Sequence, residues 1–189
     1  MMKFMIASAN DLDVFTRAQY DGLPDGRWEV ANGKAVLMTP AKFWHQRLSD
    51  RVVAELSPQI EAPGRGFVTS AVAVLIPVPP GVRAEIQSRI PDIVISSREP
   101  VDEYPVGDPP EWVIEILSTR RGNVERTEKM DDYARAGVPE YWIMSPLDRR
   151  VEVYSLHGGE YVLVGSFTHP RSLTFPGVSV DMSALWPNL

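Results

Sequence analysis

The sequence predicts one α/β (α+β) domain over residues 1–189, in which a mixed central β-sheet is flanked by helices. The length suits a single hydrophobic core. Residues 89–96 and 112–117 are apolar at nearly every position, which is typical of strands covered on both faces. Residues 39–56 carry apolar side chains at helical spacing, so a helix is expected to cover one of those faces.

The composition excludes several classes of protein. Hydrophobic residues make up 44% and charged residues 23% of the chain, which is ordinary for a globular domain and excludes global disorder. The absence of cysteine excludes a disulfide scaffold, a thiolate zinc site and a cysteine nucleophile. The net charge of -6 counts against strong non-specific binding to DNA phosphates, although a local basic cleft is compatible with it.

The apolar residues near the N-terminus are too few for the hydrophobic segment of a signal peptide. The sequence also lacks a run of about 20 apolar residues, the length that spans a membrane. We therefore expect no membrane segment and a cytoplasmic protein.

Two helices are expected in the first third of the chain. Residues 11–20 form a short one with Asp11 as N-cap. A second begins with Thr39 as cap and Pro40 in the first turn, and it ends near Pro58. Its core face is formed by a residue at every fourth position: Trp44, Leu48, Val52 and Leu56.

A β-hairpin is predicted between these helices, over residues 27–38. Two apolar runs flank Asn32 and Gly33, a dipeptide favoured in type I′ turns. With these two residues as the loop, Glu29 pairs with Val36 across the ladder.

The remaining elements follow from the same patterns. Strands are expected at residues 67–77, 89–96, 112–117 and 141–144, a hairpin at 151–167, and a short element at 182–186. A helix over residues 123–136 is closed by Gly137 in the C′ position.

Asp92 and Glu115 are the two most informative residues, because each is a carboxylate in an otherwise apolar strand. A buried carboxylate must be paired, protonated or bound to a metal. If the two strands are neighbours, both side chains project to one spot, and two carboxylates with water are a typical Mg²⁺ site. The alternative is that each carboxylate lies at a strand end, in water or on an arginine.

Lys129 lies on the predicted helix that follows Glu115, and it also has two interpretations. Glu125 and Lys129 are four residues apart, which is the spacing of a surface ion pair. If Lys129 instead turns toward the carboxylates, it can orient an attacking water or stabilise negative charge in a transition state. Helical spacing alone favours the surface pair.

Two further polar residues are weaker candidates. Glu29 in the hairpin is a third carboxylate, and His45 shares the apolar stripe of its helix. Walker A, Rossmann, H-E-x-x-H and Gly-x-Ser-x-Gly motifs are absent from the sequence.

Taken in order, several segments resemble the Uma-type family of restriction-endonuclease-like proteins, long known only as a domain of unknown function. The resemblance runs from about residue 11 to residue 164. It rests on RWEVANGK (27–34), HQR (45–47), PDIV (91–94), VIEILS (113–118), EK (128–129), YARAGV (133–138) and EYWI (140–143).

The resemblance implies a PD-(D/E)xK nuclease-like fold, with Asp92 and Glu115 as metal ligands and Lys129 as the catalytic lysine. In the usual motif the lysine lies two residues after the second acid, where this chain has Leu117. In this family, the role of that lysine is interpreted as belonging to a lysine on the next helix, here Lys129. Glu29, His45 and Glu125 then match supporting positions, although the family often has aspartate at the last of these.

We therefore expect a Mg²⁺-dependent DNA endonuclease, with Mn²⁺ as a substitute and a homodimer as the assembly that cuts both strands. Arg120, Arg121 and Arg126 are candidates for phosphate contacts. A catalytically silent binding or assembly module with an unidentified protein partner is the alternative. Hydrolysis of RNA or of a small phosphodiester is a third interpretation.

Overall fold

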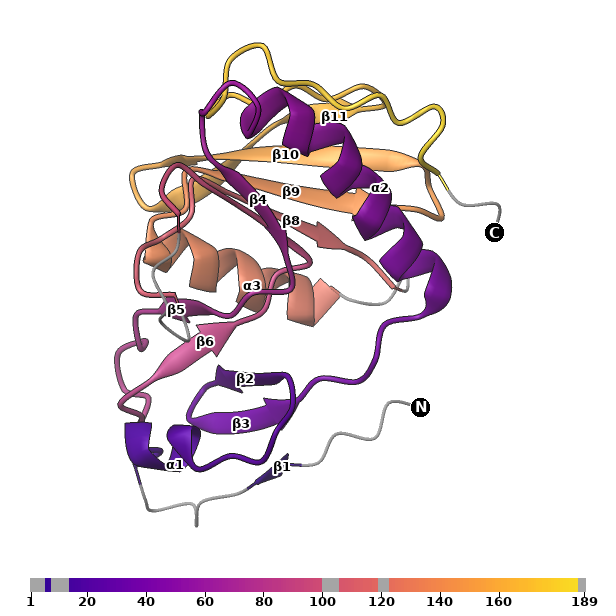
Figure 1. Cartoon of the computed structure of the whole chain (residues 1–189). Helices are drawn as coiled ribbons and strands as arrows, with labels where there is room; N and C mark the ends of the chain where they lie inside the picture. Colours follow the sequence, from indigo (N-terminus) through magenta and orange to yellow (C-terminus); the bar gives the residue numbers. More distant parts are fainter. Residues whose placement is uncertain (1–5, 8–13, 100–105, 119–122, 187–189) are drawn as a thin grey trace.

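Two β-sheets and the helices between and beside them make up the structure, a computed structural model (Figure 1). It describes residues 6–7, 14–99, 106–118 and 123–186, with the backbone alone for residues 6, 7 and 123–125.

The larger sheet contains six strands in the order β11-β10-β9-β8-β7-β4. Its bounds are β4 (Phe67–Ser70), β7 (Ile93–Ser96), β8 (Trp112–Ile116), β9 (Glu140–Ser145), β10 (Arg150–His157) and β11 (Glu160–Phe167). Strands β8 and β9 are parallel and the other neighbours are antiparallel, so the predicted mixed sheet is confirmed. Helix α3 (Asn123–Ala136) makes the crossover that the parallel pair requires.

A second, wholly antiparallel sheet has the order β1-β3-β2-β6-β5. Its bounds are β1 (Ile6–Ala7), β2 (Trp28–Ala31), β3 (Lys34–Leu37), β5 (Val74–Ile76) and β6 (Gln87–Arg89). The predicted hairpin is its centre: Glu29 pairs with Val36, and Asn32 and Gly33 both have positive φ, at 51° and 74°. The sequence analysis did not foresee this separate sheet.

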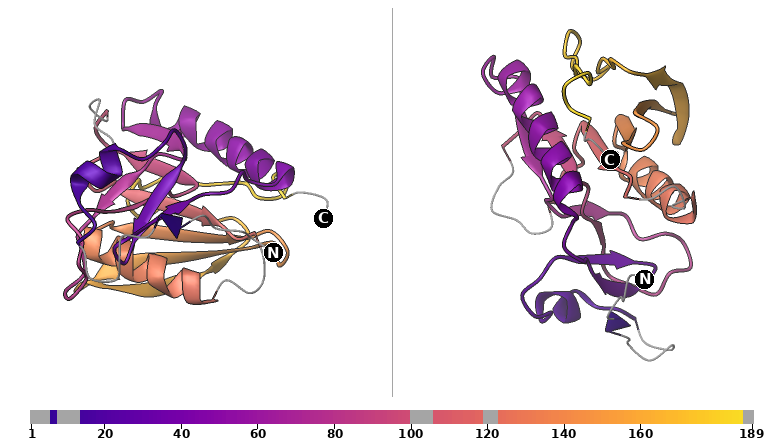
Figure 2. Two further views of the ribbon diagram at one scale, coloured as in Figure 1. Left: turned by 90° about the horizontal axis from the view of Figure 1, so that it is seen from below. Right: turned by 90° about the vertical axis from the view of Figure 1, so that its right-hand side faces the viewer.

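Helices α2 (Phe43–Ile60) and α3 lie on opposite faces of the larger sheet (Figure 2). Alternation along β8 explains this arrangement, because Trp112, Ile114 and Ile116 pack in the cluster on the α2 side and Val113 packs on the α3 side. Glu115 shares the parity of Val113 and therefore faces α3.

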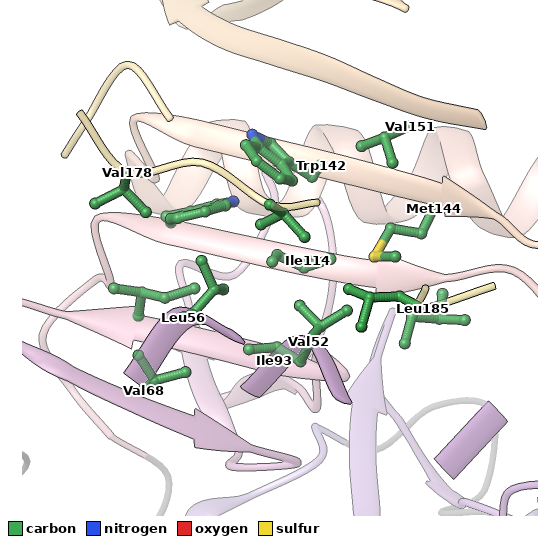
Figure 3. Close-up of a cluster of buried hydrophobic side chains, with 14 of the residues drawn as sticks. Val52, Leu56, Val68, Ile93, Ile114, Trp142, Met144, Val151, Val178 and Leu185 are labelled. Carbon is green, nitrogen blue, oxygen red and sulfur yellow. The ribbon is translucent and has the colours of Figure 1, made fainter. Parts of the chain in front are cut away.

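The α2 side holds the largest hydrophobic cluster (Figure 3). Leu48, Val52 and Leu56 of α2 are fully buried there, as their spacing predicts. The rings of Trp112 and Trp142 lie 4.3 Å apart between centroids, at a tilt of 55°. Such aromatic pairs add about 0.5–1.5 kcal/mol to the stability gained from burial alone.

Both predicted N-terminal helix starts were wrong. Helix α1 (Arg17–Asp21) is capped by Thr16 in a capping box, while Asp11 lies outside the described residues. Helix α2 begins at Phe43 rather than after Thr39.

Pro58 does not end α2 but lies within its last turn. The end predicted for this helix was therefore also wrong.

Two of the predicted strands are each divided between the sheets. The segment 67–77 splits into β4 and β5, and the chain bends at Ala71, which has a φ of 58°. The segment 89–96 splits into β6 and β7. Strand propensity marks both halves as extended but cannot show that the chain leaves one sheet for the other.

The other expected elements agree with the structure, apart from the tail. Helix α3 has the predicted bounds and Gly137 follows it with a φ of 79°. Residues 182–185 form a turn rather than a helix or strand. None of the described helices is long and apolar enough to cross a membrane.

Candidate active site

Asp92 and Glu115 lie on neighbouring segments of the larger sheet. Strands β7 and β8 pair antiparallel with Ile93 opposite Ile114. Continuing this register by one residue places Asp92 beside Glu115. The backbone N–H of Ile116 donates to Oδ2 of Asp92 at 2.7 Å, which fixes the first carboxylate against the strand that carries the second.

Asp92 does not lie inside a strand, as the sequence analysis expected, but immediately before β7. This position leaves its side chain 18% exposed, whereas that of Glu115 is 9% exposed. No hydrogen bond from a described residue reaches Oδ1 of Asp92. The strand-end alternative is therefore right about the position of Asp92, but it does not account for Glu115, which is within β8.

His45, near the start of α2, contacts this carboxylate. Its Nε2 lies 3.3 Å from Oδ2 of Asp92 and 2.9 Å from the carbonyl oxygen of Ile116. Both neighbours accept hydrogen bonds, so Nε2 must carry the proton and donate. His45 thus holds the end of β8 and Asp92 together.

Lys129 is buried and points at Glu115. Its Nζ lies 3.0 Å from both carboxylate oxygens. The hydroxyl of Tyr133, one turn further along α3, donates to Oε1 of Glu115 at 2.6 Å. The surface pairing suggested by helical spacing is therefore not the arrangement of Lys129. Glu125 lies in the first turn of α3, and its side chain is outside the described residues.

Glu29 reaches the same place from the smaller sheet. Its Oε1 lies 3.7 Å from Nζ of Lys129 and accepts the N–H of Ile90 at 3.0 Å. Its Oε2 accepts from Arg89 at 3.2 Å. Arg89 in turn binds Asp132 of α3 at 2.5 Å through Nε. The structure thus joins both sheets to α3 through buried charged groups.

The sequence analysis missed Tyr133, Arg89 and Asp132. A signal was available for two of them, because residues 129, 132 and 133 share one face of a helix. Arg89 gave no comparable signal, since its contacts depend on the second sheet.

Of the three arginines predicted to contact phosphate, only Arg126 lies within the described residues. Arg126 is bonded to Glu152 and to the hydroxyl of Tyr154 on β10. Arg120 and Arg121 lie outside the described residues.

With this geometry established, the comparisons with known proteins decide the family. A sequence profile described as "Putative restriction endonuclease" matches residues 17–183. The chain belongs to this family, Uma2. The resemblance inferred from the motifs is therefore confirmed.

The fold of this Uma2 protein also occurs in a solved structure. A crystal structure from Anabaena variabilis, described as a "putative nuclease" belonging to DUF820, is similar with a TM-score of 0.69. The similarity covers 89% of this chain and 96% of that chain, at 17% sequence identity. It shows a shared nuclease-like fold. No curated protein matches the chain.

The charged groups of the Uma2 site affect one another's pKa values. Burial raises the pKa of Glu115 above its ordinary value, Lys129 opposes this, and the negative charge of Asp92 raises it again. Burial alone would lower the pKa of Lys129, but Glu115, Glu29 and Asp92 together raise it, so the ammonium stays charged. Burial and Asp92 thus disfavour the ionised form of Glu115, and a bound cation would favour it.

His45 responds to the same carboxylate. Burial lowers the pKa of its imidazole, but the hydrogen bond and the charge of Asp92 outweigh this and raise it overall. The charged imidazolium is therefore favoured next to Asp92.

The donor set suits a hard cation. Asp92 and Glu115 offer carboxylate oxygens, and Mg²⁺ usually takes one or two carboxylates together with waters and substrate phosphate. Within the described ranges no group of three or more His, Asp or Glu residues is arranged to hold a metal ion by itself. The residues therefore fit a Mg²⁺ that shares its coordination with water and substrate, rather than an all-protein cage.

Proposed function

We propose that this Uma2 protein is a Mg²⁺-dependent endonuclease that hydrolyses phosphodiester bonds in DNA, with Mn²⁺ as a substitute. The observations that support this most are that the register of β7 and β8 brings Asp92 next to Glu115 and that Lys129 contacts Glu115. Two neighbouring carboxylates with an ammonium beside one of them can together hold a metal ion and stabilise negative charge on a phosphate, as phosphodiester hydrolysis requires.

Asp92 and Glu115 would hold the metal, since both offer oxygen ligands and Asp92 is open to solvent on one side. When bound, the metal polarises the scissile phosphate and lowers the pKa of a bound water. Lys129 stabilises the negative charge that develops on the phosphate, because its pKa is raised and its ammonium is already buried at the site.

His45 orients Asp92 in this proposal and does not contact the phosphate. Its Nε2 proton is already directed at Ile116 and Asp92, and its Nδ1 is buried without a partner among the described residues. Neither ring nitrogen is therefore available to form a hydrogen bond with substrate.

The rival proposal is a binding or assembly module that keeps the fold without cleavage. The net charge of -6 favours it, because proteins that hold DNA by phosphate contacts are usually basic. RNA or a small phosphodiester as substrate is a further alternative.

The decisive assay is cleavage of supercoiled plasmid and of labelled RNA with and without Mg²⁺. Lys129→Ala is expected to reduce the rate about 100-fold or more, as removal of one charge-stabilising donor does. Removal of Lys129 also leaves the buried Glu115 without its cationic partner, so the melting temperature of the variant has to be measured alongside.

A chemical rescue separates catalysis from stability. The chain has no cysteine, so Lys129→Cys places the single thiol of the protein at the site. Aminoethylation of that thiol in the unfolded protein restores an ammonium at nearly the same position. Recovered cleavage after refolding supports a catalytic ammonium, whereas unchanged cleavage in Lys129→Ala would remove Lys129 from the mechanism.

A further inference from the structure

Glu29 is a buried carboxylate that is held firmly in place from the smaller sheet. Its side chain is only 5% exposed. Ile90 donates its N–H to Oε1 and Arg89 donates to Oε2, at 3.0 and 3.2 Å. Each oxygen thus accepts one hydrogen bond from the protein, and Oε1 retains acceptor capacity on the side of Lys129, whose Nζ lies 3.7 Å away.

Lys129 lies between Glu29 and Glu115, and the two distances are unequal. Its Nζ is 3.0 Å from each oxygen of Glu115 and 3.7 Å from Oε1 of Glu29. The ammonium therefore contacts both oxygens of Glu115, the carboxylate that is proposed to bind the metal. Two cations on one carboxylate repel each other strongly in a buried site. A divalent cation that binds Glu115 is therefore expected to displace Lys129 from at least one of the two oxygens.

We propose that Glu29 is a positioning residue that receives the ammonium of Lys129 when a divalent cation occupies Glu115. The lysine then stays charged and directed at the site instead of moving to solvent. This inference rests on the proposed function, and it specifies the supporting role that the family resemblance implies for Glu29.

The surroundings of Glu29 suit this role. Burial raises its pKa, but the charges of Lys129 and Arg89 and the N–H of Ile90 outweigh burial, so the pKa is lowered and the carboxylate is ionised. Arg89 is itself fixed by Asp132, through a hydrogen bond of 2.5 Å. Arg89 thereby holds Oε2 and leaves Oε1 facing Lys129.

Lysine-selective ¹⁵N labelling can follow the ammonium directly. The chain has four lysines, and Lys34 and Lys42 are exposed whereas Lys129 is buried. A slowly exchanging ammonium signal that disappears in Lys129→Arg identifies the site. In the wild-type protein this signal should shift on addition of Mg²⁺ and persist. In Glu29→Gln it should be present without metal and lost by solvent exchange when Mg²⁺ is added.

Two further readouts distinguish positioning from metal ligation. We expect Glu29→Gln to keep the Mn²⁺ affinity of the wild type, to lower kcat about tenfold or more, and to leave KM unchanged. Glu152→Gln is the matched control, since it also removes a carboxylate paired with an arginine of α3 but away from the site. It should leave the lysine signal and kcat unaltered.

Either of two results would overturn the inference. An equal loss of Mn²⁺ affinity in Glu29→Gln and Glu115→Gln would make Glu29 a metal ligand. A persistent lysine signal with Mg²⁺ and wild-type kcat in Glu29→Gln would make it a structural brace. If the wild type binds Mn²⁺ but cleaves nothing, the proposed function fails, while the lysine signal still decides the role of Glu29.

Discussion

At the scale of single residues, helical spacing did not predict the contacts of Lys129. Its spacing from Glu125 suggests a surface pair, yet its ammonium is buried on Glu115. Burial arises because α3 packs against both sheets, which no window of neighbouring residues can indicate. The resemblance to the family, rather than residue chemistry, predicted that the lysine lies near the acids, and the structure shows its contact with Glu115.

The Asp92–His45 pair makes a testable prediction about pH. Asp92 raises the pKa of His45 against the effect of burial, so the charged imidazole is favoured in the folded protein. The stability contributed by this pair is therefore complete below the ordinary value of 6.5 and is lost as the pH rises through the raised pKa.

NMR titration of the three histidines checks this. The pKa of His45 should fall in Asp92→Asn, and it should also fall in the wild type when Mg²⁺ binds next to Asp92. The stability difference between wild type and Asp92→Asn should shrink as the pH rises. An imidazole pKa that is the same in both proteins would remove this pairing from the account.

At the scale of elements, the spacing of apolar residues and the residues typical of turns and caps predicted the hairpin β2–β3, the bounds of α3 and the core face of α2. The division of two strands between sheets was not predicted. Asp92 lies at such a division, after β6 leaves the smaller sheet and before β7 enters the larger one. The pairing of strands is set by contacts that are distant in the sequence, so local propensity leaves it open.

The segment after β11 is fixed to the sheet by one buried carboxylate. Oε2 of Glu140 accepts the N–H groups of Leu173 and Thr174 at 2.5 and 2.7 Å, and Oε1 accepts from Trp142 at 2.7 Å. An amide has one acceptor oxygen, so Glu140→Gln leaves at least one of these donors without a partner.

We predict that Glu140→Gln lowers the free energy of unfolding by about 1.5–3 kcal/mol, measured by urea denaturation. The exposed residue Glu160 on β11 provides the control, and Glu160→Gln should change stability little. Equal stability of the two variants would show that the Glu140 contacts do not hold the C-terminal segment.

At the scale of the whole molecule, the smaller sheet brings Glu29 and Arg89 to α3, and the larger sheet brings Asp92 and Glu115. The site forms where residues from the two sheets lie close to α3. Sequence reasoning could therefore identify the acids as candidates but could not derive the charged network that surrounds them, because that network depends on the second sheet.

Self-association is a further prediction at this scale. Strand β11 is the edge of the larger sheet, and three consecutive apolar residues on it are exposed by 44–52%: Val162, Leu163 and Val164. No charged residue lies between Tyr161 and Phe167, so the edge lacks the charges that usually prevent pairing. We propose that two copies pair along β11.

Sedimentation equilibrium should then give a dimer for the wild type and a monomer for Leu163→Lys. Leu147→Lys is the control, because Leu147 is 46% exposed but is not part of β11. A monomeric wild type, or equal dissociation of both variants, would contradict an interface at this edge.

The central claim is that Asp92 and Glu115 together bind a divalent cation, and direct Mn²⁺ titration tests it independently of any substrate. We predict about one Mn²⁺ per chain at millimolar concentrations, displaced by Mg²⁺, with binding lost in Asp92→Asn and Glu115→Gln. Binding should be retained in Asp108→Asn, whose side chain is 83% exposed. A wild-type protein that binds no Mn²⁺, or an Asp92→Asn variant that binds it equally well, would contradict the account.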